Sequence, residues 1–155
     1  MPQVFAFFCN PENLPRIMPE ATETKIDELR LVAPSAAGNP VADAHAAGVG
    51  TVIVTSFRMF PFLPLRAQWI AIITEFEWNH YFADVQSKGP FKSWQHRHEF
   101  LAESRGGIEG TLVRDVVDYE VGFGFLGWFA NLLLVERQMR GTFAARQKVL
   151  PGLLS

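Results

Sequence analysis

Two histidines carry the clearest chemical signal in this chain. His96 and His98 lie two residues apart in the string WQHRHEF, and the side chains of a β-strand alternate between its two faces. If this segment is a strand, both imidazoles point the same way, with Trp94 and Phe100 beside them and polar side chains on the other face. The pattern therefore predicts two imidazoles, flanked by aromatic rings, that are aimed at one place.

The partner of these histidines follows from the turn expected at Gly106-Gly107. Two consecutive glycines supply the positive φ angles of a tight hairpin turn. This turn sets His98 opposite Asp115, and it sets Trp94 opposite Tyr119. A carboxylate beside an imidazole fixes its tautomer and raises its basicity, as proton transfer or ligand binding requires. His98 and Asp115 are therefore the candidate catalytic residues.

Two other interpretations of this pair stay open at the level of sequence. His98 and Asp115 can simply satisfy each other's hydrogen bonds beside the core, or their face can be the outer, solvated one. Since the two faces of a strand alternate residue by residue, the second case would exchange all the interior residues. Arg97, Glu99 and Arg114 would then take the interior positions.

The sequence gives little support for a metal site or a cofactor site. Two histidines at this spacing on a strand can coordinate one ion, with Asp115 as a third ligand. Two ligands and an inferred third form a weak pattern, and we predict no metal site. The segment Gly122 to Gly127 matches a dinucleotide fingerprint in its letters, but no strand-helix-strand unit surrounds it. We expect no cofactor.

The rest of the chain supplies the elements that must position these residues. Local patterns predict short helical turns within residues 4–18 and a long loop over 34–48. Alternating or β-branched segments predict strands at 24–33, 50–59, 65–78, 81–87, 91–104 and 109–121. The last part changes to a helical period, which predicts a long amphipathic helix over 128–150.

The predicted helix has one apolar side. Its apolar stripe consists of Trp128, Leu132, Val135, Met139, Phe143 and Leu150. The charged residues Glu136, Arg137, Arg140, Arg146 and Lys148 lie mostly off this stripe, and Pro151-Gly152 is expected to end the helix. The stripe predicts that the helix packs against the sheet.

Composition limits the class of protein. A chain of 155 residues with 48% hydrophobic content suits a single domain over residues 1–155, and fourteen Phe and four Trp suit an apolar core or pocket. A net charge of −2 without a Lys/Arg run excludes a nucleic-acid partner. A single cysteine, the lack of a secretory signal and the lack of an apolar run of roughly 20 residues predict a cytoplasmic protein without a transmembrane segment.

Several strings resemble the SRPBCC superfamily of START-related, polyketide cyclase/dehydrase-like and pollen-allergen-like proteins. They are VFAFFCNPENLPRIMP (4–19), FADVQSKGPFKSWQHRHEF (82–100), GGIEGTLVRDVVDYEVGFGFLG (106–127) and LLVERQMRGTFAARQKVL (133–150). The resemblance implies an α+β helix-grip fold, in which a curved antiparallel sheet wraps around a long C-terminal helix and encloses an apolar cavity. It is closest to the ligand-binding SRPBCC group, whose members mostly lack an assigned reaction.

The chain departs from this family at its start. Helix-grip domains begin with a strand, and here only Met1-Pro2-Gln3 precedes Val4. Without that strand, residues 24–33 and 109–121 have unpaired edges, which invite pairing with another chain. Either the true protein is longer, or a homo-oligomer covers these edges.

Together these observations predict a protein that binds a hydrophobic small molecule, such as a lipid, an isoprenoid or a polyketide-like compound. The predicted ligand-binding residues are Trp69, Trp94, His96, His98, Phe100, Asp115, Tyr119, Leu132, Val135, Met139 and Phe143. The alternative is an enzyme of the cyclase/dehydratase type, in which His98 held by Asp115 moves a proton. A third possibility is a partner-binding role through the exposed edges and the turn at 60–65.

Overall fold

The N-terminal part forms short helices, as predicted. The computed structural model describes residues 1–35, 45–58, 65–122 and 135–154. Helix α1 spans Pro2–Cys9 and α2 spans Leu14–Ile17, with 3-10 turns at Pro11–Asn13 and Glu20–Thr22. Proline in a first helical turn loses no helical hydrogen bond, and the side chain of Asn10 accepts one from the backbone N–H of Glu12 over 3.0 Å. These local signals explain where the helices begin.

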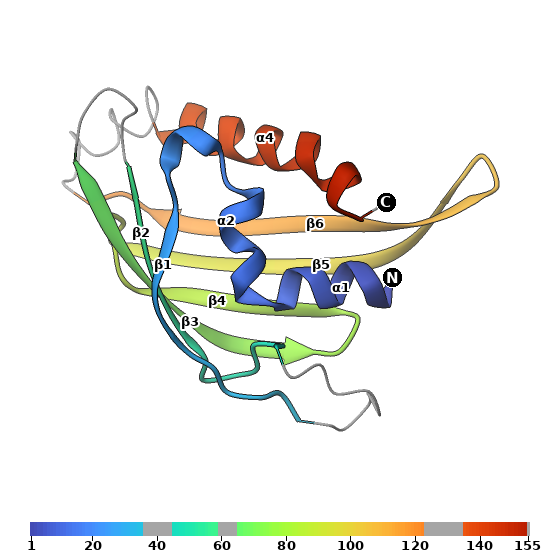
Figure 1. Cartoon of the computed structure of the whole chain (residues 1–155), viewed down its shortest axis with the longest axis horizontal. Coiled ribbons are helices and arrows are strands. Elements are labelled where there is room, and N and C mark those ends of the chain that lie inside the picture. Colours follow the sequence, from blue (N-terminus) through green and yellow to red (C-terminus); the bar gives the residue numbers. More distant parts are fainter. Residues whose placement is uncertain (36–44, 59–64, 123–134, 155) are drawn as a thin grey trace.

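Six antiparallel strands form one sheet, in the order in which they occur along the chain (Figure 1). They are β1 (Lys25–Arg30), β2 (Val52–Arg58), β3 (Arg66–Glu77), β4 (Tyr81–Lys88), β5 (Ser93–Arg105) and β6 (Ile108–Glu120). All six overlap the predicted strands. The turn between β5 and β6 has φ angles of 58° at Gly106 and 82° at Gly107, which confirms the predicted hairpin.

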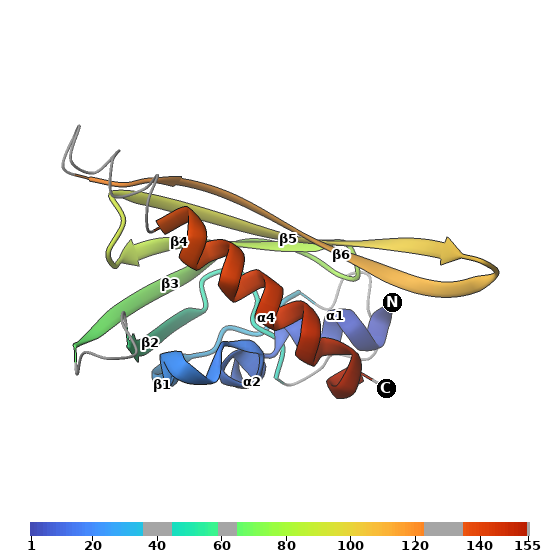
Figure 2. The same ribbon diagram turned by 90° about the horizontal axis from the view of Figure 1, so that it is seen from above.

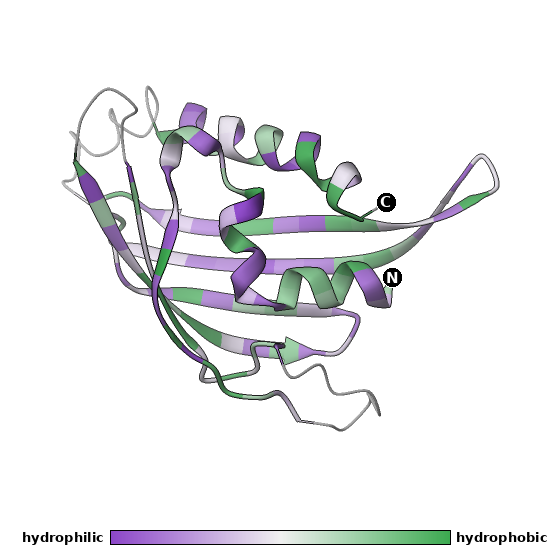
Figure 3. Cartoon of the chain, viewed as in Figure 1, coloured by the Kyte–Doolittle hydropathy of each residue, from purple (hydrophilic) through white to green (hydrophobic). Residues whose placement is uncertain are grey.

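Alternation sets which side chains face the interior. Along β6 half-buried and exposed residues alternate from Thr111 to Glu120. Figure 3 shows that hydrophilic and hydrophobic stretches follow one another along β6, whereas much of β5 is hydrophilic. Strands β1 and β6 lie at the two edges of the sheet, and among the described residues no strand precedes α1. Within the described part of the chain, each of these two strands therefore has a strand on one side only, as predicted.

The C-terminal helix α4 (Glu136–Leu154) lies on the concave face of the sheet, as do α1 and α2 (Figure 2). This is the predicted helix-grip arrangement. The predicted end at Pro151-Gly152 is wrong, because the helix continues to Leu154. Leu150 and Leu153 are three residues apart on one side and pack against the core, which offsets the hydrogen bond lost at Pro151. Trp128 and Leu132 lie outside the described residues.

An aromatic cluster joins α1 to the sheet. Phe5 is 1% exposed, and its ring contacts four others at centroid distances from 5.0 to 6.2 Å: Phe76, Trp78, Phe82 and Phe100. Edge-on pairs of this kind stabilise a core beyond the apolar area that they bury. Helix α1 therefore covers one end of the concave face and leaves the space beside α2 and α4 for the site.

Candidate functional site

A cavity of about 370 Å³ lies between the concave face of the sheet and the helices. Most of its wall is apolar and comes from β2, β3, β5, the N-terminal helices and α4. Four ionisable side chains also line it: Asp84, His96, His98 and Arg146. An apolar cavity with a few convergent polar groups is the usual form of a small-molecule site.

The predicted register of the β5–β6 hairpin is confirmed. His98 lies directly opposite Asp115, and Trp94 lies opposite Tyr119. Both histidines are buried, with exposures of 7% for His96 and 8% for His98. The histidine face is therefore the inner one.

The opposite face of β5 points outward, so the alternative with an interior Arg97 is wrong. Nη1 of Arg97 lies 2.7 Å from Glu75, and its guanidinium stacks 3.7 Å from the ring centre of Tyr81. Arg114 pairs with Glu99 on the same outer surface. These charges face solvent because they belong to the other set of alternating positions.

Asp115 joins three side chains from two elements. Its Oδ1 lies 2.9 Å from Nε2 of His96, 2.7 Å from Nδ1 of His98 and 3.3 Å from Nη1 of Arg146. The contacts of His96 and Arg146 have the direction of hydrogen bonds, whereas Nδ1 of His98 is close to the carboxylate but poorly aligned with it. Arg146 comes from α4, so this carboxylate ties the helix to the sheet.

Burial and charge shift the ionisation of Asp115 and His98. Burial by itself would raise the pKa of Asp115, but the contacts with His96 and His98 and the charge of Arg146 outweigh it and hold this pKa well below its usual range. Burial, with the neighbouring His96, lowers the pKa of His98 to about 3 despite its contact with Asp115. At neutral pH, Asp115 is a carboxylate and His98 is a neutral imidazole.

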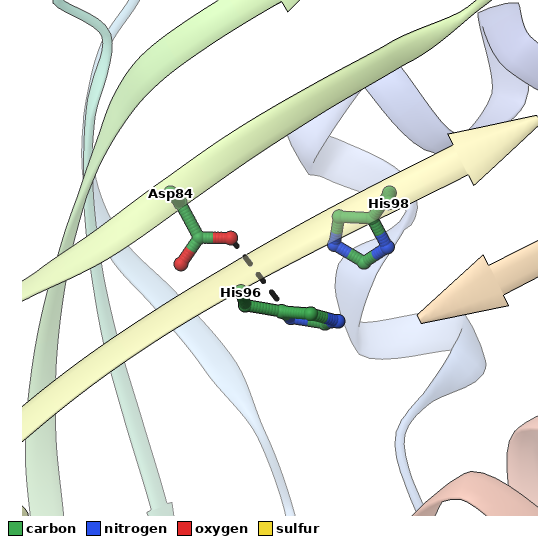
Figure 4. Close-up of side chains that lie close together, drawn as sticks. All are labelled: Asp84, His96 and His98. Atoms are coloured by element: carbon green, nitrogen blue, oxygen red, sulfur yellow. Dashed lines mark ion pairs between the residues drawn. The ribbon is translucent and has the colours of Figure 1, made fainter. Parts of the chain in front are cut away.

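Asp84 is the fourth member of the cluster, and it comes from β4. It lies directly opposite His96, and its Oδ2 is 3.9 Å from Nδ1 of His96 (Figure 4). Burial raises the pKa of Asp84 to about 6, although the charges of His96 and Arg146 oppose the shift. This carboxyl group therefore titrates near neutral pH while facing an apolar cavity.

Sequence analysis missed Asp84 and misplaced Arg146. The helical pattern predicts Arg146 off the apolar stripe, but it is 6% exposed and faces Asp115. Its spacing held a signal, since position 146 fills the seven-residue gap in the stripe between Phe143 and Leu150. For Asp84, a two-residue turn at Gly89-Pro90 would have set it opposite Gln95, whereas the structure pairs it with His96.

The other predicted site residues fall into two groups. The cavity is lined by Trp69, Trp94, Val135, Met139 and Phe143, in addition to His96 and His98. Three predicted residues lie behind this lining or away from it: Phe100, Asp115 and Tyr119. Leu132 lies outside the described residues.

Phe100 and Tyr119 do not line the cavity and pack against other residues. Phe100 is 2% exposed and belongs to the aromatic core around Phe5, because that core lies under α1 rather than under α4. The ring of Tyr119 packs against Phe91 and Trp94 at centroid distances of 5.4 and 6.0 Å. Both thus support residues that form the wall or the core.

Comparisons with known proteins agree with this geometry. The sequence model of one family, described as polyketide cyclase / dehydrase and lipid transport, matches residues 1–148. Among curated proteins, no sequence matches the chain. Within the described residues, no helix has both the length and the apolar character needed to cross a membrane.

Two solved structures have the same fold. TTHA0849 from Thermus thermophilus has a TM-score of 0.60 and 16% identity, over 94% of this chain and 83% of its own. Ara h 8.0201 has a TM-score of 0.51 and 13% identity, over 97% of this chain and 91% of its own. The match to the family model over nearly the whole length shows that the chain belongs to the polyketide cyclase / dehydrase and lipid transport family, within the SRPBCC superfamily.

Proposed function

We propose that the protein binds a hydrophobic small molecule, such as a lipid, an isoprenoid or a polyketide-like compound, in the cavity between the sheet and α4. The observation that supports this function best is the distribution of polar groups in the cavity. Asp84, His96 and His98 lie together and Arg146 joins them through Asp115, while most of the remaining wall is apolar. A ligand with an apolar body and one polar end matches this division.

The proposed roles follow from position. Trp69, Trp94, Val135, Met139 and Phe143 form the apolar wall that holds the body of the ligand. His96 and His98 face its polar end. Asp115 acts through these histidines by holding their rings. A volume of about 370 Å³ is near the lower end of the usual range for ligand pockets, which favours a compact molecule over a long-chain lipid.

Proton transfer by the His98–Asp115 pair has less support than binding. An effective general base has a pKa near the working pH, and burial lowers the pKa of His98 to about 3. Nδ1 of His98 is also poorly aligned with the carboxylate. The cyclase/dehydratase function stays a prediction.

Blocking the cavity tests the binding function. Ala71 lines the cavity from β3, so Ala71→Phe should fill part of it. Ala102 is exposed near the end of β5, so Ala102→Phe is the matched control. We expect the wild type and Ala102→Phe to bind the fluorescent probe 1-anilinonaphthalene-8-sulfonate with equal affinity, and Ala71→Phe to bind it at least ten times more weakly.

Equal affinity of all three proteins for the probe would place binding elsewhere and contradict the proposal. Native mass spectrometry of protein purified from cells provides an independent readout. We expect a co-purified small molecule on the wild type and less of it on Ala71→Phe.

Three sequence predictions about partners and location remain predictions. The open edges of β1 and β6 favour a homo-oligomer, because strands with free backbone groups pair with other strands. Sedimentation velocity over a range of concentrations tests this, and a monomer at all concentrations would contradict it. The cytoplasmic location and the absence of a nucleic-acid partner rest on composition alone.

A further inference from the structure

Three potential metal ligands from two neighbouring strands converge on the cavity wall. Asp84, His96 and His98 each offer one ligand atom, and these atoms all lie within 4.8 Å of one another. Strand pairing explains the grouping, since Asp84 lies directly opposite His96 and His98 follows on the same face of β5. Figure 4 shows the carboxylate and the two imidazoles gathered together.

The hydrogen bond from His96 to Asp115 leaves the other ring nitrogen of His96 available to a metal ion. Asp115 is in contact with the guanidinium of Arg146, so it is ionised and only accepts hydrogen bonds. Nε2 of His96, 2.9 Å away, must therefore donate its proton to Asp115. In the neutral ring, Nδ1 of His96 then carries a lone pair, and it lies 3.9 Å from Oδ2 of Asp84. Two acceptors that face each other at this distance favour a cation between them.

His98 has a similar arrangement. Its Nδ1 is 2.7 Å from the same oxygen of Asp115, which leaves Nε2 as the nitrogen available to a metal. Histidines that bind metals almost always present their other ring nitrogen to a carboxylate or a carbonyl, which fixes the tautomer and the ring. Asp115 occupies this position for both histidines, as a hydrogen-bond acceptor for His96 and in close contact with Nδ1 of His98.

The charges around Asp84 also favour a cation at this place. Arg146 compensates the charge of Asp115, from which its Nη1 is 3.3 Å. Among the described residues, Asp84 has no ion-pair partner within 4.0 Å other than His96. The carboxylate of Asp84 and the two imidazoles thus form a donor set of two nitrogens and one oxygen.

We propose that Asp84, His96 and His98 bind a divalent first-row transition-metal ion such as Zn²⁺, and that Asp115 orients both imidazoles. Bonds of about 2.0–2.2 Å in tetrahedral geometry separate ligand atoms by roughly 3.4 Å, so the side chains must approach by about an ångström. Three protein ligands leave at least one position open to the cavity. An oxygen atom of a bound small molecule suits this position.

This site differs from both expectations drawn from the sequence. There, no metal was predicted, and the weaker alternative used Asp115 as the third ligand. The geometry gives the direct contact to Asp84 and the supporting role to Asp115. The difference arises because β4, and not β6, brings its carboxylate to Nδ1 of His96.

Metal titration of EDTA-treated protein tests the proposal. We expect one Zn²⁺ per chain by isothermal titration calorimetry, and visible absorption bands when Co²⁺ replaces Zn²⁺. Asp84→Asn keeps the shape of the side chain and should weaken Zn²⁺ binding at least 100-fold. Asp115→Asn should weaken it by roughly 10- to 100-fold, as expected for a residue that supports metal ligands.

The double variant His45→Ala/His80→Ala is the control, because these two histidines lie outside the cluster, and it should bind Zn²⁺ as the wild type does. If Asp84→Asn does not fold, His98→Phe provides the second measurement, since it keeps an aromatic ring among Phe8 and Phe82. The proposal is overturned if the wild type binds no ion or if the folded variant binds Zn²⁺ unchanged. No hydrophobic ligand is present in this titration, so its result is independent of the proposed binding function.

Discussion

Nε2 of His96 on β5 donates a hydrogen bond to Oδ1 of Asp115 on β6 over 2.9 Å, and this contact places a charged carboxylate behind the cavity wall. The same carboxylate pairs with Arg146, which is 6% exposed. Removing one partner of a buried ion pair leaves the other charge unpaired, which costs far more than the loss of a surface pair. The stability of the domain should therefore depend strongly on this one aspartate.

Asp115→Asn should lower the free energy of unfolding by about 3–5 kcal/mol, because it leaves the Arg146 guanidinium buried without a counter-charge. Urea unfolding measures the change. Asp118→Asn is the matched control, since Asp118 is an exposed aspartate on the same strand, and it should change stability by less than about 0.5 kcal/mol. Equal effects of the two variants would contradict the central role of Asp115.

Arg146→Met should also destabilise the protein, but the combination with Asp115→Asn should cost less than the sum of the two single changes. Each single variant leaves an unpaired charge, whereas the double variant leaves none. We expect a coupling free energy of about 0.5–3 kcal/mol from a double-mutant cycle. Arg140→Met, at an exposed arginine paired with Glu136 one turn away, should cost less than about 1 kcal/mol. Strict additivity would show that Asp115 and Arg146 do not act as a pair.

The pH dependence of the free energy of unfolding should reveal the raised pKa of Asp84. As pH falls from 6.5 towards 3, the unfolded chain takes up a proton on His98 that the folded protein does not, so stability is lost. As pH falls from about 6 to 3.8, the folded protein takes up a proton on Asp84 that the unfolded chain does not, so stability is gained. The two effects oppose each other between roughly pH 6 and 4.

In Asp84→Asn only the loss from His98 remains. Relative to the wild type, this variant should lose stability as pH falls through that window, by up to about 1.4 kcal/mol per pH unit. Urea unfolding in EDTA at several pH values measures the difference. Asp118→Asn should give a curve parallel to the wild type. A parallel curve for Asp84→Asn would mean that Asp84 does not bind a proton more tightly in the folded state.

Leu153→Ala tests the helical end that the sequence did not predict. Leu153 packs against the core from beyond Pro151, so its truncation should lower the free energy of unfolding by about 1–2 kcal/mol, less than for a fully buried leucine. Val149 is 43% exposed on the same helix, and Val149→Ala should have less than half this effect. If both changes are neutral, the last turn of α4 does not contribute to the fold.

Local patterns were enough to predict the strands and the pairing of His98 with Asp115, because alternation and the Gly-Gly turn act over a few residues. They left open which face of the strand with His96 and His98 is the inner one. The β4–β5 turn is different. The side chain of Gln86 bonds to the backbone N–H and carbonyl of Phe91, and a Cβ at Gly89 would lie 2.2 Å from this side chain. A turn held by a side chain follows no simple register rule, so the position of Asp84 opposite His96 was not predicted.

The burial of Arg146 was beyond sequence reasoning for another reason. Arginine is rarely buried without a partner, and its partner here lies 31 residues earlier on a different element. A position between Phe143 and Leu150 suits the inner side of the helix, but the predicted apolar stripe left out the charged Arg146. The packing of α4 across the sheet brings Arg146 to Asp115, and this contact decides between the inner and the outer side.

The contacts of Phe5 also bear on how the chain folds during synthesis. The four rings around Phe5 come from residues 76 to 100, so the docking site of α1 is incomplete until β5 exists. At roughly 5–20 residues per second, about 5–20 seconds of translation separate Phe5 from Phe100. Until then the apolar side of α1 lacks part of its packing partners, and transiently exposed apolar surface of this kind favours aggregation.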